Sequence, residues 1–299
     1  MIKSEYAPIA LFAYNRPDRL KAAIQALQTN PEASDSDLYI FIDGARSDAD
    51  VEKVNECKLV ASETSGFRNI TVSASAKNKG LGPSLIAGIT AVIEKYGKVI
   101  VIEDDLIVSP NFLAFINQGL QKYAGKKEVF SICGYTNRVK LPQNYKFNAY
   151  FAPRSSSWGW ATWADRWNQV DWELSDWGKV ASTKSAFNRW GGSDCFGMLQ
   201  GWKQGLNRSW AIRFCYAQFC TGTTSLFPVR SLVENDGFDG AGTNCKKWSR
   251  FKYDMMESDK RDFNLPNQIK EIPALTRQAL KYHSLPLRLY SKIMYLIYK

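Results

Sequence analysis

Three consecutive acidic residues, Glu103, Asp104 and Asp105, directly follow the aliphatic run at 99–102. Like charges held this close repel one another and shift each other's pKa values unless a cation neutralises them. Carboxylate oxygens are hard ligands that suit Mg²⁺ or Mn²⁺, ions that usually keep several waters and bind substrate phosphates. The triplet therefore has two interpretations, a solvated loop cap after a strand or a divalent-metal site.

The histidine count restricts the remaining chemistry. The chain holds one histidine, His283. A Ser-His-Asp or Cys-His nucleophile is therefore not expected, and neither is a metal site built from several histidines. Acid–base chemistry in this protein must rely on carboxylates. The six cysteines form no CxxC pair, which favours a reducing compartment over a disulfide scaffold or a structural zinc site.

Alternating segments in the first half predict the elements that position the acids. Apolar runs predict strands at 9–14, 38–42, 70–73 and 99–102, and periodic patterns predict helices at 17–27, from about 49, at 83–96 and from 109–110. Strands separated by helices pair in parallel and build a doubly wound sheet. The predicted fold class is therefore α/β, with a mostly parallel sheet and flanking helices.

Several polar residues follow these predicted strands. Ligands of doubly wound sheets bind beyond the carboxyl ends of the strands, so Arg16, Asp43 and the acidic triplet should gather at one edge. This convergence favours the metal interpretation over the loop cap. With Arg16 at the same edge, the expected ligand is a nucleotide diphosphate, whose departing charge the metal would stabilise. The segment 78–84 (NKGLGPS) could add backbone N–H groups, but it matches neither a dinucleotide fingerprint nor a Walker loop.

The second half has a different composition. All ten tryptophans lie between Trp158 and Trp248, and glycine-rich turns occur at 191–194 and 236–242. We expect most of these tryptophans in the core and two or three as platforms for sugar rings. We therefore divide the chain into a nucleotide-sugar-binding half (1–135), an acceptor-binding half (136–270) and a basic amphipathic tail (271–299).

Charge points to a surface partner for the tail. The formal net charge is +10, but the positive residues are scattered and no nucleic-acid-binding signature accompanies them, so no nucleic-acid partner is expected. No acidic residue follows Glu271. Residues 281–299 are too short and too charged to span a bilayer. They predict either a helix on an anionic membrane surface or a helix docked on the protein's own core.

The first residues of the chain show no charged-then-apolar signal segment. We therefore expect a cytoplasmic protein, with peripheral binding at the inner face of the plasma membrane as the alternative that the tail raises.

Several segments together resemble a known family. They are PIALFAYNRPDRL (8–20), FIDGARSD (41–48), VIVIEDDLIVSPNF (99–112), SSSWGWATWADRW (155–167), SWAIRF (209–214) and SLVENDGFDGAGTN (231–244). In this order they resemble GT-A fold glycosyltransferases, a Rossmann-like class. The resemblance is to the branch that contains eukaryotic N-acetylglucosaminyltransferase I and bacterial transferases of surface polysaccharide synthesis. It covers residues 7 to 245.

The resemblance implies a role for each matching residue. It implies Mn²⁺ or Mg²⁺ as cofactor and a UDP-sugar as donor. The implied roles are Asp105 as direct metal ligand, Glu103 and Asp104 as supports of the sugar-nucleotide, Asp43 at the uracil, Arg16 at the diphosphate, and Trp158 and Trp160 along the donor-sugar and acceptor cleft.

Three positions depart from the bacterial pattern. Relatives commonly read DSWAIRW, but Arg208 stands in the place of that aspartate and Phe214 in the place of the last tryptophan. They tend to read GTH where this chain has GTN at 242–244. If the missing aspartate were the catalytic base, this chain would need another carboxylate.

Asp194 is our candidate for that base, because it lies in a glycine-rich turn within the acceptor-binding half. Glu234 and Asp236 are the next candidates. The alternative for Asp194 is an ordinary turn-forming aspartate.

We interpret the chain as a metal-dependent, inverting hexosyl- or N-acetylhexosaminyltransferase. It would move sugar from a UDP-sugar to a hydroxyl of a growing glycan, or lipid-linked glycan, in polysaccharide or lipopolysaccharide synthesis. One alternative is a sugar-phosphate nucleotidyltransferase, but those enzymes carry a glycine-rich loop with a basic residue after the first strand, which AYNRPDRL lacks. Another is a catalytically idle carbohydrate-binding protein, which Arg208 favours and the intact acidic triplet opposes.

Overall fold

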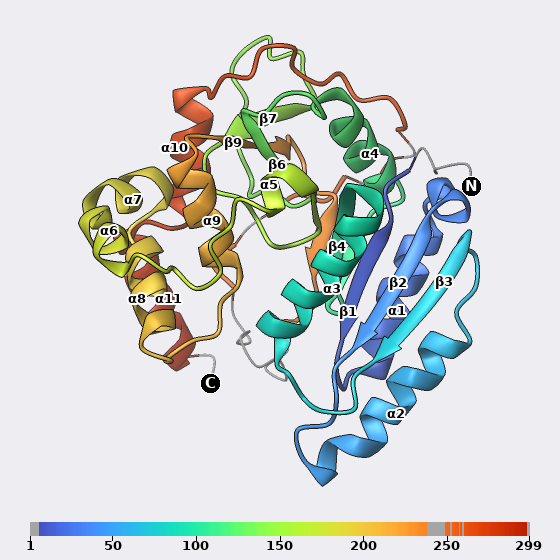
Figure 1. Cartoon of the computed structure of the whole chain (residues 1–299). Coiled ribbons are helices and arrows are strands. Elements are labelled where there is room, and N and C mark those ends of the chain that lie inside the picture. Colours follow the sequence, from blue (N-terminus) through green and yellow to red (C-terminus); the bar gives the residue numbers. More distant parts are fainter. Residues whose placement is uncertain (1–5, 238–248, 252, 257, 259, 298–299) are drawn as a thin grey trace.

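The computed structural model describes residues 6–237, 249–251, 253–256, 258 and 260–297 (Figure 1). The first elements are β1 (Ile9–Ala13), α1 (Pro17–Gln28), η1 (Pro31–Asp35), β2 (Asp37–Ile42), α2 (Asp48–Ser62), β3 (Asn69–Ala74), α3 (Leu81–Tyr96), β4 (Lys98–Glu103), β5 (Leu106–Val108) and α4 (Phe112–Lys122). The later elements are β6 (Val129–Cys133), β7 (Ala149–Ala152), β8 (Trp160–Trp163), α5 (Ala164–Trp167), α6 (Trp177–Ser182), α7 (Lys184–Gly191), α8 (Cys195–Lys203), α9 (Ala211–Cys220), β9 (Thr224–Pro228), β10 (Val233–Asn235), α10 (Pro273–Lys281) and α11 (Leu285–Ile297).

Local sequence explains the helix that leads into the acidic triplet. Pro83 lies in the first turn of α3, where a missing N–H costs no hydrogen bond. Gly97 ends the helix in the left-handed region (φ +76°), and its N–H donates to the carbonyl of Ile93 at 2.7 Å. The chain then enters β4 directly, so the triplet stands at the far end of a short, fixed unit.

In the described residues, one sheet of eight strands has the order β3-β2-β1-β4-β8-β6-β9-β7. β1 pairs in parallel with β2 and β4, β2 with β3, and β6 with β9. β8 runs antiparallel between β4 and β6, so β6 and β9 point the same way as β4. The carboxyl ends of all these parallel strands therefore meet at one edge of the sheet.

Helices cover both faces of the sheet. One core cluster joins α1, α2 and α4 to alternate residues of β1, β2 and β4, and a second joins α3 and α9 to the intervening residues. All five residues of β1 are buried, as expected of a central strand covered on both sides. The α/β fold class with a mostly parallel sheet is confirmed, as are the strands and helices predicted in the first half.

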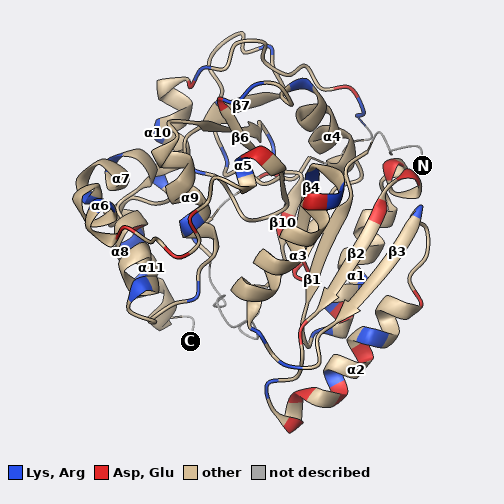
Figure 2. Ribbon diagram, viewed as in Figure 1, with Lys and Arg blue, Asp and Glu red and all other residues tan. Residues whose placement is uncertain are grey.

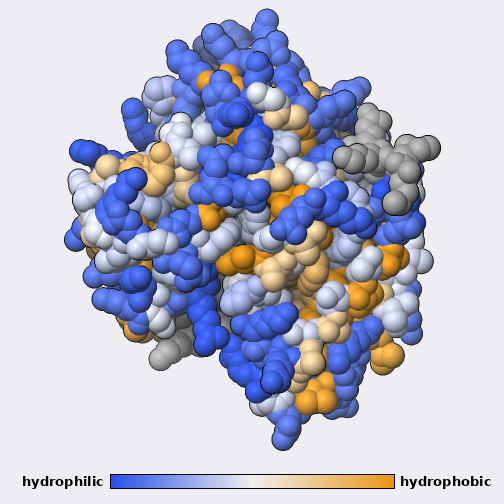
Figure 3. Space-filling model, in the orientation of Figure 1, coloured by the Kyte–Doolittle hydropathy of each residue, from blue (hydrophilic) through white to orange (hydrophobic). Residues whose placement is uncertain are grey.

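The outer strands are less well covered. β3 is an edge strand with mostly exposed residues, and Val72 is among its exposed apolar side chains. Figure 3 shows an apolar area on the right of the view, where β2 and β3 lie in Figure 1. The sheet is thus protected best in its centre, where the acidic triplet emerges.

The two predicted halves share this sheet. β6, β7, β8 and β9 extend it beyond residue 128, and helices α6 to α9 pack around a separate aromatic cluster beside it. In Figure 1 these helices form the left side of the molecule. The division at residue 135 is therefore a division within one continuous sheet.

The tail begins with a docked helix. α10 packs on β7 through Leu275, which is buried with Tyr150 and Phe227. None of the helices in the described part of the chain is long and apolar enough to cross a membrane.

Candidate active site at the carboxyl edge of the sheet

The structure brings three sequence-predicted segments together where β2, β1 and β4 end. The N–H of Asp43 donates to Ala13 at 3.1 Å, and the N–H of Asp104 donates to Phe12 at 2.9 Å. The residues that follow β1 therefore lie between the ends of β2 and β4. The predicted gathering of these side chains at one edge is present.

Arg16 is the cation that faces the acids. Its guanidinium lies 3.6 Å from Asp104 Oδ1 and 3.4 Å from Asp105 Oδ2. The N–H of Tyr14 also donates to Asp104 Oδ2 at 3.4 Å. The Asp104 and Asp105 side chains are only 6% and 13% exposed. One arginine thus serves two carboxylates in a largely buried place, so the triplet is more than a solvated loop cap.

Burial perturbs the acids of the triplet. Burial, with the charges of Asp105 and Asp104 adding to it, raises the pKa of Glu103 to about 8. Burial also raises the pKa of Asp104 to about 6, against the opposing effect of Arg16. Desolvation and mutual repulsion both disfavour the charged forms, which means that one arginine does not balance the cluster.

The acids do not form a complete metal cage. Within the described ranges, no three acidic, histidine or cysteine side chains are arranged to hold an ion. A carboxylate such as Asp105, which retains some solvent exposure, suits Mg²⁺ or Mn²⁺ in another way. These ions are often held by one or two carboxylates and take their other ligands from waters and substrate phosphates. The donor set fits such an ion together with a phosphate ligand.

The hairpin-like pairing of β5 with β10 adds acids that sequence reasoning ranked second. β10 runs antiparallel to β5, and the N–H of Asp236 donates to the Asp105 carbonyl at 2.9 Å. Arg19 lies 3.2 Å from the Asp236 carboxylate and also donates to its carbonyl. Glu234 accepts a hydrogen bond from the Tyr253 hydroxyl at 3.2 Å. Two further carboxylates therefore come from β10 and the residue after it, beside the triplet.

Gly237 is the signal that could have found this contact. A Cβ at Gly237 would lie 2.8 Å from Asp105 Oδ2 and 2.8 Å from the side-chain oxygen of Asn235. Only glycine permits so close an approach without displacement of the acid. The glycine in the sequence NDG marks the place where this segment meets the triplet.

Asp43 is buried and already bonded. Its carboxylate accepts from the N–H groups of Gly44 (3.0 Å), Lys79 (2.9 Å) and Gly80 (2.8 Å). These bonds tie the end of β2 to the turn before α3, in which Gly80 has φ +81°. The observed contacts make Asp43 a support of this turn, and its contact with uracil stays a prediction.

Arg208 lies against the same turn. Its Nη1 would be 3.2 Å from a Cβ at Gly80, and its carbonyl would be 2.9 Å from a Cβ at Gly82. The residue that replaces the family's aspartate is thus an exposed cation at the start of α3. Phe214 is buried in the core, where it packs on Trp160 at 4.8 Å between ring centroids. Residues 242–244, the third departure, lie outside the described residues.

The two tryptophans predicted to contact sugar have different environments. Trp160 is 1% exposed, stacks on Trp210 and lies near Trp167, so the prediction that it lines the cleft is wrong. Its place in β8, inside the sheet, fixes it in the core. Trp158 is half-buried and packs edge-on against Tyr135 at 4.4 Å. A sugar contact of Trp158 stays a prediction.

Asp194 lies in a buried ion pair away from the triplet's arginine. Its carboxylate accepts from Arg154 Nη1 at 2.8 Å and Nη2 at 3.3 Å, and His283 Nδ1 is 3.8 Å away. Although burial opposes ionisation, Arg154 and His283 hold the pKa of Asp194 well below its usual range. A carboxylate this acidic is a poor proton acceptor. Its role as base stays untested, and these contacts favour a structural role.

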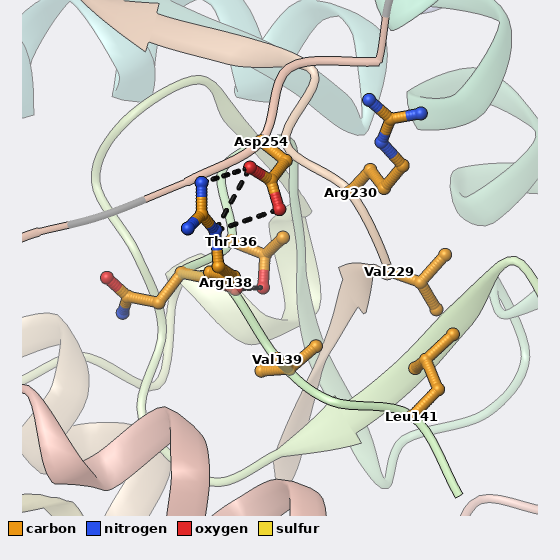
Figure 4. Close-up of a pocket in the computed structure, with 8 residues that line it drawn as sticks. Thr136, Arg138, Val139, Leu141, Val229, Arg230 and Asp254 are labelled. Carbon is orange, nitrogen blue, oxygen red and sulfur yellow. Dashed lines mark hydrogen bonds and ion pairs between the residues drawn. The ribbon is translucent and has the colours of Figure 1, made fainter. Parts of the chain in front are cut away.

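A pocket of about 170 Å³ lies where β6 and β9 end, on the same edge of the sheet as the triplet (Figure 4). Arg138 and Asp254 form an ion pair on one side of it, with Arg138 Nε 2.9 Å and 3.0 Å from the two carboxylate oxygens. Val139 and Val229 supply apolar lining. The edge thus offers polar groups and space beyond the triplet, toward the second half.

Comparisons with known proteins give two partial likenesses. No protein-family model matches the sequence, and a search of curated proteins gives no match. An active-site mutant of LgtC aligns with TM-score 0.34 and 12% identity over 55% of this chain and 60% of that chain. Glucosyl-3-phosphoglycerate synthase from Mycobacterium tuberculosis, solved with Mn²⁺, uridine diphosphate and glucosyl-3-phosphoglycerate, aligns with TM-score 0.31 and 15% identity over 44% of each chain. The chain spans less than two thirds of both.

Proposed function

We propose that the chain is a metal-dependent GT-A glycosyltransferase that moves a sugar from a UDP-sugar to a hydroxyl group. The observation that carries the proposal is the cluster of Asp104 and Asp105 around Arg16 at the carboxyl edge of a parallel sheet. Doubly wound sheets bind their ligands at this edge. The ordered motifs of the sequence support the same class.

The residues of the edge divide the work of donor binding. Asp105 would hold Mg²⁺ or Mn²⁺, and the bound ion supplies stabilisation of the negative charge on the leaving diphosphate. Arg16 would move its charge from the acids to the diphosphate oxygens. Glu103 and Asp104 would orient the ribose and sugar hydroxyls, and Asp43 would keep the turn before α3 in place beneath the base.

A carboxylate from β10 or the residue after it would take the proton in an inverting reaction. The acceptor oxygen attacks the anomeric carbon while the bond to the diphosphate oxygen breaks with its electron pair, and the hydroxyl proton goes to the carboxylate. Glu234 and Asp236 are better placed for this than Asp194, because they lie beside Asp105 rather than in a matched ion pair. The pocket at the ends of β6 and β9 would receive part of the acceptor.

We extend the proposal to a growing glycan of bacterial surface polysaccharide or lipopolysaccharide, with a hexose or N-acetylhexosamine donor, on the resemblance of the motifs. Arg208 favours a second candidate function, a carbohydrate-binding protein that has lost turnover. That protein would bind UDP-sugar or glycan and release no UDP.

Release of free UDP from a panel of UDP-sugars tests the proposal. UDP-glucose, UDP-galactose and their N-acetyl forms are offered with Mn²⁺ and, separately, with EDTA. We expect Mn²⁺-dependent UDP release from at least one donor, because even without the native acceptor water can replace it slowly. Metal-independent release contradicts the metal-dependent mechanism. Tight UDP-sugar binding without release from any donor establishes the binding protein instead.

A further inference from the structure

Helix α11 turns its apolar side chains away from the protein. Leu285, Leu289, Ile293 and Leu296 repeat at helical spacing on its outer side, and each is about half exposed or more. Tyr290 and Ile297 widen this surface, and they are also about half exposed or more. We call these six side chains the α11 outer face.

The opposite side of α11 is attached mainly by polar contacts. Ser291 is its buried residue. Arg288 donates to the Ser193 hydroxyl at 3.1 Å, and that hydroxyl donates to the His283 carbonyl at 3.0 Å. These bonds fix the helix on the turn between α7 and α8. Docking on the protein core is left to α10, so the tail combines the two arrangements that its sequence allows.

The charge around the outer face is of one sign. Residues 272–297 contain no acid, and Lys281 and Lys292 are exposed. Helices α7 and α8, against which α11 is attached, contribute Lys184, Arg189 and Lys203 and also lack acids. In Figure 2, α11 carries blue and no red, whereas α2 carries both colours.

We propose that the α11 outer face binds an anionic lipid membrane, with the helix parallel to the surface. Its 13 residues measure about 20 Å at 1.5 Å per residue, less than the hydrocarbon core of a bilayer. Leucine and isoleucine would enter the acyl boundary, while Lys281 and Lys292 would meet anionic headgroups. The proposal is independent of catalysis and goes beyond the transferase.

Charge favours lipid over a second copy of the chain. In a symmetric dimer the same patch faces itself, so Lys281 and Lys292 of one copy would lie near those of the other. Without acids from 272 to 297, the patch offers these cations no partner of opposite charge. An anionic bilayer supplies such partners at every position.

Vesicle flotation of the full chain tests the proposal. Vesicles of phosphatidylcholine alone are compared with vesicles that contain 30% phosphatidylglycerol, about the share at which surface charge is strong. We expect flotation with the anionic vesicles and loss of it in high salt. The double variant Leu289→Gln/Ile293→Gln should lower the partition coefficient at least about tenfold, because both side chains are buried only in lipid. Lys292→Gln should lower it about fivefold.

Matched variants on α2 serve as controls. Leu59 is 60% exposed on α2, and Lys53 is exposed on the same helix. Leu59→Gln and Lys53→Gln should leave flotation unchanged. Equal flotation of the α11 and α2 variants, or no flotation of the wild-type chain, overturns the proposal. A wild-type dimer that Ile293→Gln makes monomeric, with no flotation, would also overturn it and assign the face to self-association. Because flotation needs no activity, its failure leaves the proposed function untouched.

Discussion

Two clusters of buried carboxylates, around Asp105 and around Asp194, differ in how their charge is balanced. Asp194 has one arginine to itself, with both oxygens within 3.3 Å of the Arg154 guanidinium. Asp104 and Asp105 share Arg16 at 3.4–3.6 Å, and Glu103 adds a third acid. A matched pair is complete and holds elements together. A triplet that shares one cation retains capacity for another, which is what a metal–diphosphate site requires.

The largest expected effect sharpens this comparison by locating the base. Removal of a general base costs about 10²–10⁴ in rate. Glu234→Gln and Asp236→Asn are measured for kcat with UDP-sugar and acceptor. We expect one of them to lose activity in this range while UDP binding persists, because both carboxylates lie beside the triplet. If neither changes kcat and Asp194→Asn does, the base is Asp194 and our comparison of the two clusters fails.

Asp194→Asn should act mainly on stability. Loss of one partner from a buried ion pair leaves Arg154 uncompensated and costs about 3–5 kcal/mol. Chemical denaturation measures the free energy of unfolding. Asp254→Asn is the matched control, because the Arg138–Asp254 pair is exposed and worth about 1 kcal/mol or less. Equal destabilisation by the two variants would contradict the structural role of Asp194.

The tryptophans of the second half separate core from surface. Trp160→Ala should destabilise the fold by about 3–5 kcal/mol, since the ring fills a fully buried place. Trp158→Ala should raise KM for donor or acceptor with a smaller loss of melting temperature, because its ring is half-buried. Steady-state kinetics and thermal melts on both variants provide the test. A normal KM with a large loss of melting temperature would make Trp158 another core residue.

The smallest effect is a pH dependence near the Asp194 pair. Burial, with Arg154 adding to it, lowers the pKa of His283 to about 4 from its usual 6.5. The unfolded chain therefore binds a proton more readily than the folded chain between these values, so this contribution to stability is lost as pH falls from about 6.5 toward 4. Asp194, with its lowered pKa, keeps its contribution until pH falls below about 3.8.

The histidine contribution is read as a difference. Glu103 and Asp104 have raised pKa values and add the opposite slope, so the unfolding free energy of His283→Gln is subtracted from that of the wild-type chain at each pH. We expect the difference to shrink between pH 6.5 and 4. A difference that stays constant would mean that His283 is not buried in its neutral form.

The sequence predicted the first half well because hydrophobic periodicity is local. Strand ends follow from the pattern, and parallel pairing then places Arg16 and the acidic triplet at one edge. The approach of Asp236 to Asp105 could not be read this way, since it depends on the long-range pairing of β5 with β10. Gly237 was the local trace of that contact.

The second half was harder because residue type does not reveal the partner. Asp194 in a glycine-rich turn looks the same whether or not Arg154, 40 residues earlier in the chain, reaches it. Trp158 and Trp160 are also equivalent in the sequence, and only the position of Trp160 within β8 buries it. Charge balance and burial decide these roles, and both are properties of the packed chain.

Calorimetric titration of UDP into the protein, with and without Mn²⁺, tests the central claim most directly. We expect binding that requires Mn²⁺, is lost in Asp105→Asn, and persists in Asp18→Asn, an exposed acid on α1. Loss of the single carboxylate that reaches the metal should weaken binding by several kcal/mol. UDP binding of equal affinity in EDTA, or an unchanged affinity in Asp105→Asn, would contradict a metal–diphosphate site at this edge of the sheet.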